Sequence, residues 1–144
     1  MKRLFTIAAV LLTLTSFGQK VVTKKAPSTV TIPLLDGLDF KNNITFKVVQ
    51  PTKFDSLYGK TSINSIENNL HIASMFLSFE MKNPNSYKPI ASPINKIMLM
   101  DFDGKTIVSV TIVAESQNGY GNKITKEYHC YTDLDGTNFK LSSY

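Results

Sequence analysis

The chain has 144 residues, of which 42% are hydrophobic and 19% charged, with 16 lysines and arginines against 11 acidic residues. This length is typical of a single domain that buries its own core, and a lone cysteine cannot form an internal disulfide. Arg3 is the only arginine, and since arginine is the residue that recognises phosphates and bases bidentately, the composition argues against nucleic-acid binding.

Residues 1–18 have the pattern of a secretory signal peptide. Lys2 and Arg3 precede an apolar run from residue 4 to residue 14, and the small residues Ser16 and Gly18 follow it. The run is too short to span a bilayer as a helix, so the sequence predicts an exported protein, periplasmic or extracellular, without a transmembrane anchor. Cleavage before Gln19 leaves 14 basic residues, all lysines, against 11 acidic ones, a net charge of +3.

Residues 19–28 are basic and contain Pro27, which predicts a flexible leader before a single β-rich domain at 29–144. Two strands follow, each with apolar residues at every second position. Pro33 places the first of them at a sheet edge, where the missing proline N–H does least harm. The alternating residues are Val30, Ile32 and Leu34 in the first strand, then Ile44, Phe46 and Val48 in the second.

The segment from residue 62 to residue 83 supports two interpretations. Over residues 70–83, period-two alternation favours a strand with Ala73, Met75, Leu77, Phe79 and Met81 on its inner face and Ser74, Ser78, Glu80 and Lys82 on its outer face. Helical spacing also fits, with Ser62 as a candidate N-cap and an apolar face of Ile63, Ile66, Leu70, Ala73 and Leu77. We favour the strand, and a helix near residues 62–77 is the alternative.

The rest of the chain predicts an antiparallel meander. A proline-rich loop at 83–93 is followed by strands that Asp103-Gly104 joins as a hairpin, with Val108, Val110, Ile112 and Ala114 as the inward row. Two further strands place Ile124, Tyr128 and Cys130 on one face and turn at Leu134-Asp135-Gly136. About seven strands in all predict an all-β antiparallel sandwich, immunoglobulin-like in general architecture but without paired cysteines or tryptophan. The alternative is an α+β roll with the helix near 62–77 packed on an antiparallel sheet.

The stretch SQNGYGNK, residues 116–123, joins two predicted strands. A phosphate cradle needs a helix after its glycines, so a turn is favoured, with positive φ expected at Asn118, Gly119 and Gly121. A turn does not require the aromatic ring of Tyr120 at its tip. We therefore predict a binding site at Gly119, Tyr120 and Gly121, with Tyr87 of the proline-rich loop as a further contact.

Catalytic and metal chemistry find little support in the sequence. Two Asp-x-Asp-Gly stretches, which start at Asp101 and Asp133, resemble the beginning of a calcium loop but lack the later carboxylates, so plain hairpin turns are favoured. His129 and Cys130 are neighbours on a strand and point to opposite faces, which argues against a dyad. We expect no cofactor and no metal. A hydrolase that uses Glu80, Glu115 or His71 is the weakest interpretation.

The predicted function is therefore that of a small exported, non-catalytic β-sandwich. It would bind another macromolecule, not nucleic acid, at the cell envelope or outside the cell. The alternative is a periplasmic α+β roll that holds a small apolar ligand between its helix and its sheet.

Overall fold

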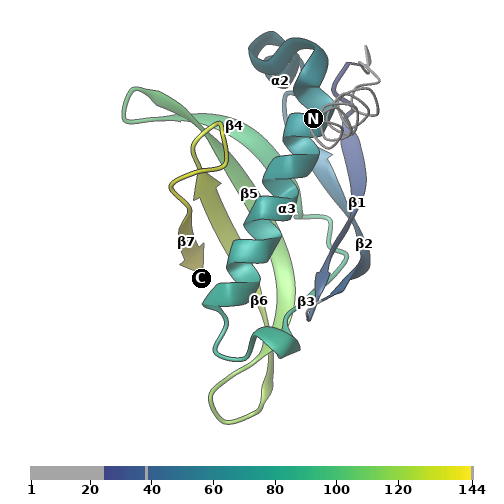
Figure 1. Cartoon of the computed structure of the whole chain (residues 1–144), viewed down its shortest axis with the longest axis vertical. Helices are drawn as coiled ribbons and strands as arrows, with labels where there is room; N and C mark the ends of the chain where they lie inside the picture. The colour runs from purple at the N-terminus through teal and green to yellow at the C-terminus, as the bar shows by residue number, and fades with distance from the viewer. Residues whose placement is uncertain (1–24, 38, 144) are drawn as a thin grey trace, which may run out of the picture.

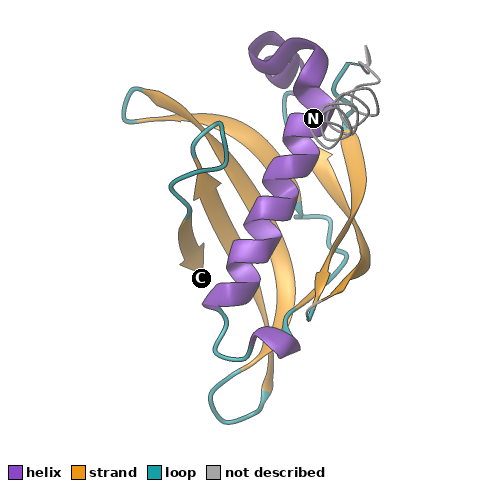
Figure 2. Ribbon diagram, viewed as in Figure 1, coloured by secondary structure: helices purple, strands orange, loops and turns teal. Residues whose placement is uncertain are grey.

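The computed structural model describes residues 25–37 and 39–143. The predicted signal peptide and its cleavage site lie outside these residues. Within them, one long helix crosses one face of a mixed seven-stranded sheet (Figures 1 and 2). The strands are β1 Thr29–Asp36, β2 Asp39–Val48, β3 Lys88–Pro89, β4 Lys96–Phe102, β5 Lys105–Gln117, β6 Lys123–Thr132 and β7 Lys140–Ser143. The helices are α2 Pro51–Tyr58 and α3 Ser62–Glu80, with short 3-10 turns η1 Gly59–Thr61 and η2 Pro84–Ser86.

The sheet order is β1-β2-β4-β5-β6-β7, and β3 also pairs with β5. All neighbouring strands are antiparallel except β2 and β4, which pair in parallel at only two positions, Lys47 with Lys96 and Val48 with Ile97. The helices connect these two parallel strands, as a parallel pair requires. The predicted first strand is confirmed, and β1 lies at a sheet edge with Pro33 inside it.

Helix α3 buries a stripe of apolar side chains against the sheet. Ile66, Leu70, Ala73 and Leu77 have no exposed surface, and they recur at the three- and four-residue spacing of one helix face. The facing row on β5 is the predicted one, Val108, Val110, Ile112 and Ala114, all buried. Side chains from both layers fill the space between helix and sheet, among them Leu34, Phe46, Tyr87 and Ile97.

The strand predicted over residues 70–83 is wrong, because residues 70–80 lie in the 19-residue helix α3. Ala73 and Leu77 lie on the buried face whether the segment is a strand or a helix, so the alternation of apolar residues alone did not distinguish the two interpretations. Ser74 and Ser78, expected in solvent, are buried, and Phe79, expected in the core, is 63% exposed. The all-β sandwich is therefore not confirmed, and the α+β alternative fits the fold.

Two smaller expectations also need correction. Ser62 is the first residue of α3 and not its N-cap, and its hydroxyl donates to Gly59 O at 2.6 Å. The end of the predicted leader is docked on the domain, because Ala26 is buried and its N–H donates to Asp55 Oδ1 on α2 at 2.8 Å. Helix α2 itself was not predicted, although Pro51 stands in its first turn, where proline is favoured.

The loop between β6 and β7 packs against the flank of α3. Gly136 has φ of 82° and is so close to the helix that a Cβ there would lie 2.5 Å from Ile72 Cδ1. Nearby, Phe139 stacks on Phe76 with ring centroids 5.1 Å apart, and Tyr58 donates to Leu134 O at 2.8 Å. These contacts hold the loop and the start of β7 in place.

Leu70→Ala tests the buried stripe of α3. Truncation of a fully buried leucine is expected to lower the free energy of unfolding by about 2–5 kcal/mol. Phe79→Ala on the same helix removes a largely exposed ring and is expected to change stability by less than about 0.5 kcal/mol. Urea denaturation of both variants measures the difference, and equal losses would contradict the orientation of α3.

Gly136→Ala and Gly121→Ala form a matched pair that tests the docked loop. Both glycines have nearly the same φ, 82° and 81°, but nothing lies within 4 Å of a Cβ at Gly121. Positive φ costs either alanine about 1–2 kcal/mol, and Gly136→Ala is expected to cost about 1 kcal/mol more, because Ile72 must change rotamer.

Ile72→Val removes the clashing methyl group and should abolish that extra cost in the Gly136→Ala background. Urea denaturation of the single and double variants completes the cycle. The docked loop is refuted if Gly136→Ala costs no more than Gly121→Ala.

Candidate functional site

The face of the sheet turned away from α3 is not covered by any helix of the described residues (Figures 1 and 2). Its side chains come from the strand positions that alternate with the core rows. The strand register aligns them in rows across the sheet. One row runs Met98, Ser109, Tyr131 and Lys140, and the row beside it runs Lys47, Lys96, Thr111, His129 and Ser142.

A groove of about 640 Å³ lies on this face, beside the β4–β5 turn. Met100, Ile107 and Tyr131 supply its apolar floor, and all three are partly exposed. The remaining lining residues are Phe102, Asp103, Lys105, Thr132, Asp133, Asn138, Lys140 and Ser142. Apolar side chains in an open hollow, with polar and charged groups around them, are typical of a binding site.

The β4–β5 turn forms one wall of the groove. Asp103 and Gly104 both have positive φ, 50° and 74°, the combination that a tight two-residue hairpin turn requires. The turn pairs Phe102 with Lys105 across its base. As a result, a 62% exposed aromatic ring and a lysine stand together at the rim.

The β6–β7 loop forms the opposite wall, and its carboxylates are held by neighbouring residues. Asp133 accepts a hydrogen bond from Asn138 Nδ2, and Asp135 accepts from both the hydroxyl and the N–H of Thr137. The bonds from Thr137 hold the pKa of Asp135 below its ordinary value. Across the described ranges, no three potential metal ligands come together. The chain turns here, with Gly136 N–H donating to Asp133 O at 2.9 Å.

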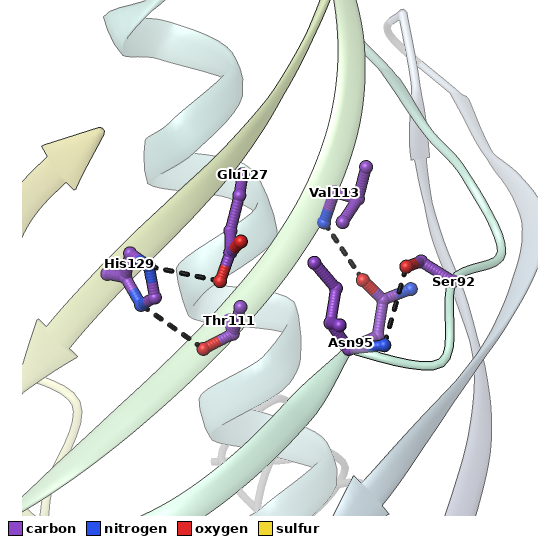
Figure 3. A network of polar contacts seen from close by, with 7 residues as sticks. Ser92, Asn95, Thr111, Val113, Glu127 and His129 are labelled. Atoms are coloured by element: carbon purple, nitrogen blue, oxygen red, sulfur yellow. Dashed lines mark hydrogen bonds and ion pairs between the residues drawn. The ribbon is translucent and has the colours of Figure 1, made fainter. Parts of the chain in front are cut away.

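A second hollow, of about 430 Å³, lies on the same face between the β1–β2 hairpin and the loop before β4. It is lined by Thr29, Thr45, Lys47, Ala91, Ser92, Pro93 and Asn95. Asn95 is buried and fixes this loop, because its side chain donates to Ile90 O and accepts from Val113 N, each at 2.9 Å. Figure 3 shows the bond between Asn95 and Val113. The loop that separates β3 from β4 thus remains attached to β5.

Figure 3 also shows a chain of polar contacts on the uncovered face. The Thr111 hydroxyl and His129 Nδ1 are 3.3 Å apart, and His129 Nε2 lies 3.2 Å from Glu127 Oε1. The order of hydroxyl, imidazole and carboxylate is that of a hydrolytic triad. However, Thr111 has no exposed surface, so a substrate carbonyl has no path to its hydroxyl. The chain of contacts instead satisfies polar groups of β5 and β6.

Cys130 faces the core on the side opposite His129, as predicted from their adjacency. Burial raises the pKa of its thiol to about 12, so almost no thiolate is present near neutral pH. The other candidate catalytic residues also lie apart. His71 is on α3 against the ring of Phe40, Glu80 ends that helix, and Glu115 on β5 pairs with Lys123 at 2.6 Å.

The predicted tip residues stand at the far end of β5 and β6. Tyr120 is 92% exposed, and Asn118 Oδ1 orders the loop by accepting from the N–H groups of Tyr120 and Asn122 at 2.9 and 3.0 Å. Only Gly121 has positive φ, so that prediction was wrong for Asn118 and Gly119. The loop joins two strands, as expected, and presents Tyr120 to solvent.

Tyr87 does not share this exposure. It follows η2, has no exposed surface, and its hydroxyl lies 3.0 Å from Ser74 Oγ on α3. Burial raises the pKa of this hydroxyl well above its usual value, although the Ser74 contact acts in the opposite direction. The proposal that Tyr87 contacts a partner is therefore corrected, because its ring is part of the core between helix and sheet.

The groove residues were not singled out from the sequence. Met100 and Ile107 alternate with core positions in β4 and β5, so they read as the outer positions of half-buried strands. The signal that points to them is the apolar character of these outer positions, since outer positions of an open sheet are usually polar. Locating the groove also required the register that aligns β4, β5 and β6.

No protein-family model matches the sequence, and no similar protein was found among curated proteins or solved structures. None of the helices in the described part of the chain has the length and apolarity that crossing a bilayer demands. The uncovered face and the tip are therefore the features of the molecule that point to a function.

A thiol reagent such as dithionitrobenzoate tests the state of Cys130. Because the thiol is buried and its pKa is about 12, native protein at mildly alkaline pH should react at least about 100-fold more slowly than protein unfolded in guanidinium. Absorbance of the released thiolate measures both rates. If the native protein reacts as fast as the protein in guanidinium, Cys130 is not buried, and a role for its thiol as a nucleophile has to be considered again.

Proposed function

We propose that this protein is an exported, non-catalytic α+β domain that binds another macromolecule at the cell envelope or outside the cell. The groove on the uncovered sheet face is the main contact surface. The observation that carries this proposal is the presence of Met100, Ile107 and Tyr131 as a partly exposed apolar floor on a sheet face without a covering layer.

The chemistry of the groove favours binding. Met100 has a flexible, polarisable side chain that adapts to irregular partner surfaces, and Tyr131 offers a large ring with a polar end. Phe102 at the rim adds a ring that is already exposed. These are the residue types that dominate the energy of protein interfaces when a partner removes water from them.

Tyr120 is a second proposed contact, with Gly119 and Gly121 on either side. The 13 residues of β5 span roughly 40 Å, so the tip and the groove lie at opposite ends of a long strand. The hydrogen bonds of Asn118 hold the tip in one conformation, which reduces the entropy lost when Tyr120 meets a partner.

The export part of the proposal rests on the basic and apolar pattern of residues 1–18. The absence of catalysis is supported by the burial of Thr111 and Cys130, the two residues whose neighbours most resemble catalytic partners. The two hollows described above lie on the uncovered face, and not in the space between helix and sheet that the alternative of an apolar ligand requires.

Site-specific photo-crosslinking in intact cells tests this function. A benzophenone amino acid in place of Phe102 or Tyr120 is expected to form a covalent adduct with a macromolecule. The same group in place of Lys60, an exposed residue of η1 outside both hollows, is expected to form none. Gel shift and mass spectrometry identify the adducts.

A control variant keeps the probe at position 102 and adds Ile107→Ala and Tyr131→Ala. We expect less adduct from this variant, and thermal unfolding checks that it is still folded. If Phe102 forms no adduct, or forms the same adducts as Lys60, the groove is not the contact surface.

A further inference from the structure

The charges around the groove suggest the chemistry of the partner. Lys105 and Lys140 line the groove itself, while Lys96 and Lys47 lie on the neighbouring row of the same face. None of the four takes part in the ion pairs formed within the described residues, whose cations are Lys41, Lys53, Lys123 and His129. The apolar floor is thus bordered by lysines that have no carboxylate partner among the residues the structure describes.

Lys47 and Lys96 are direct neighbours across the parallel pairing of β2 and β4. Strands in a sheet lie about 4.8 Å apart, so the side chains start close together, and like charges at adjacent positions are unfavourable. Lys47 also lines the second hollow. A partner that brings negative charge to this position relieves the repulsion.

The acidic groups of the same region are fewer and partly engaged. Asp133 accepts from Asn138, and Glu127 lies against His129, while Asp103 is in the β4–β5 turn. The groove lining itself is balanced, with Lys105 and Lys140 against Asp103 and Asp133. With Lys96 and Lys47 on the neighbouring row, the face carries four lysines against three acidic groups, two of which already have partners. The complementary partner has carboxylates around apolar side chains.

We propose that the groove binds an acidic polypeptide segment of another protein, with apolar side chains seated on Met100, Ile107 and Tyr131 and carboxylates directed to Lys105 and Lys140. A long acidic segment would extend past Lys96 to Lys47. This inference rests on the proposed function and deepens it by naming the chemistry of the partner. An extended segment suits an open groove on a sheet, where apolar side chains enter the hollow and charged ones stay at the rim.

Fluorescence anisotropy with labelled hexapeptides tests the proposal. The probes are Asp-Glu-Phe-Leu-Glu-Asp, a charge-reversed Lys-Lys-Phe-Leu-Lys-Lys, and an acidic Asp-Glu-Ser-Ser-Glu-Asp without the apolar centre. The first is expected to bind about tenfold more tightly than either of the others, because it alone has both features. Higher salt should weaken its binding, since the rim contacts are exposed.

Paired variants of equal net charge locate the effect. Lys105→Glu with Lys140→Glu should weaken binding of the first hexapeptide about tenfold, as two attractions become repulsions. Lys60→Glu with Lys126→Glu makes the same change in net charge at exposed residues that do not line the groove, and should change affinity less than about threefold.

The proposal is overturned if the acidic and charge-reversed hexapeptides bind equally, if the serine hexapeptide binds as well as the apolar one, or if both variant pairs lose the same affinity. It is also overturned if vesicles of phosphatidylglycerol bind through Lys105 and Lys140 while the acidic hexapeptide does not, because the occupant would then be a lipid surface. If one of these results is obtained but the probe at Phe102 still forms a specific crosslink, the acidic partner is wrong and the proposed binding function is still supported.

Discussion

The packing of α3 against one face of the sheet is the interaction on which the rest of the structure depends. Ile66, Leu70 and Leu77 are fully buried there, and the loops around the helix are fixed by it, through Tyr87 with Ser74 and Gly136 beside Ile72. Only one long helix is present among the described residues, so it covers one face of the sheet and no helix covers the other. Neither layer buries its apolar face without the other, and the open face follows directly from this arrangement.

The sequence predicted the strands well because their signals are local. Alternation in β1, β2 and β5 and the Asp103-Gly104 turn depend on neighbouring residues only. The helix was misassigned because Ala73 and Leu77 satisfy both periods, and because Ser74 gains its partner only in the folded chain. Its hydroxyl lies 3.0 Å from that of Tyr87, which comes from another part of the fold. Such contacts are not visible in a sequence read segment by segment.

The same distinction between local signals and contacts of the folded chain applies to the candidate site residues. Tyr120 was singled out because an aromatic residue between glycines is unusual in a turn, and its ring is exposed; its role as a contact stays a prediction. Tyr87 was misjudged because a proline-rich loop usually lies on the surface, whereas here Gly37 N–H donates to Tyr87 O at 2.6 Å and draws the loop against the hairpin. The groove depends on strand register, since Ile107 and Tyr131 are 24 positions apart in the sequence and come together only when β5 pairs with β6.

Lysine footprinting in living cells tests most directly whether the uncovered face is a binding surface. An amine-reactive reagent would be applied to cells that express the protein and, separately, to the purified protein, and modification at each lysine would be compared by mass spectrometry. If a partner occupies the uncovered face, Lys105 and Lys140 are protected in cells relative to the purified protein, while Lys60 and Lys126 are modified equally in both. Equal modification at all four positions, or protection confined to Lys60 and Lys126, would contradict the presence of a partner on this face.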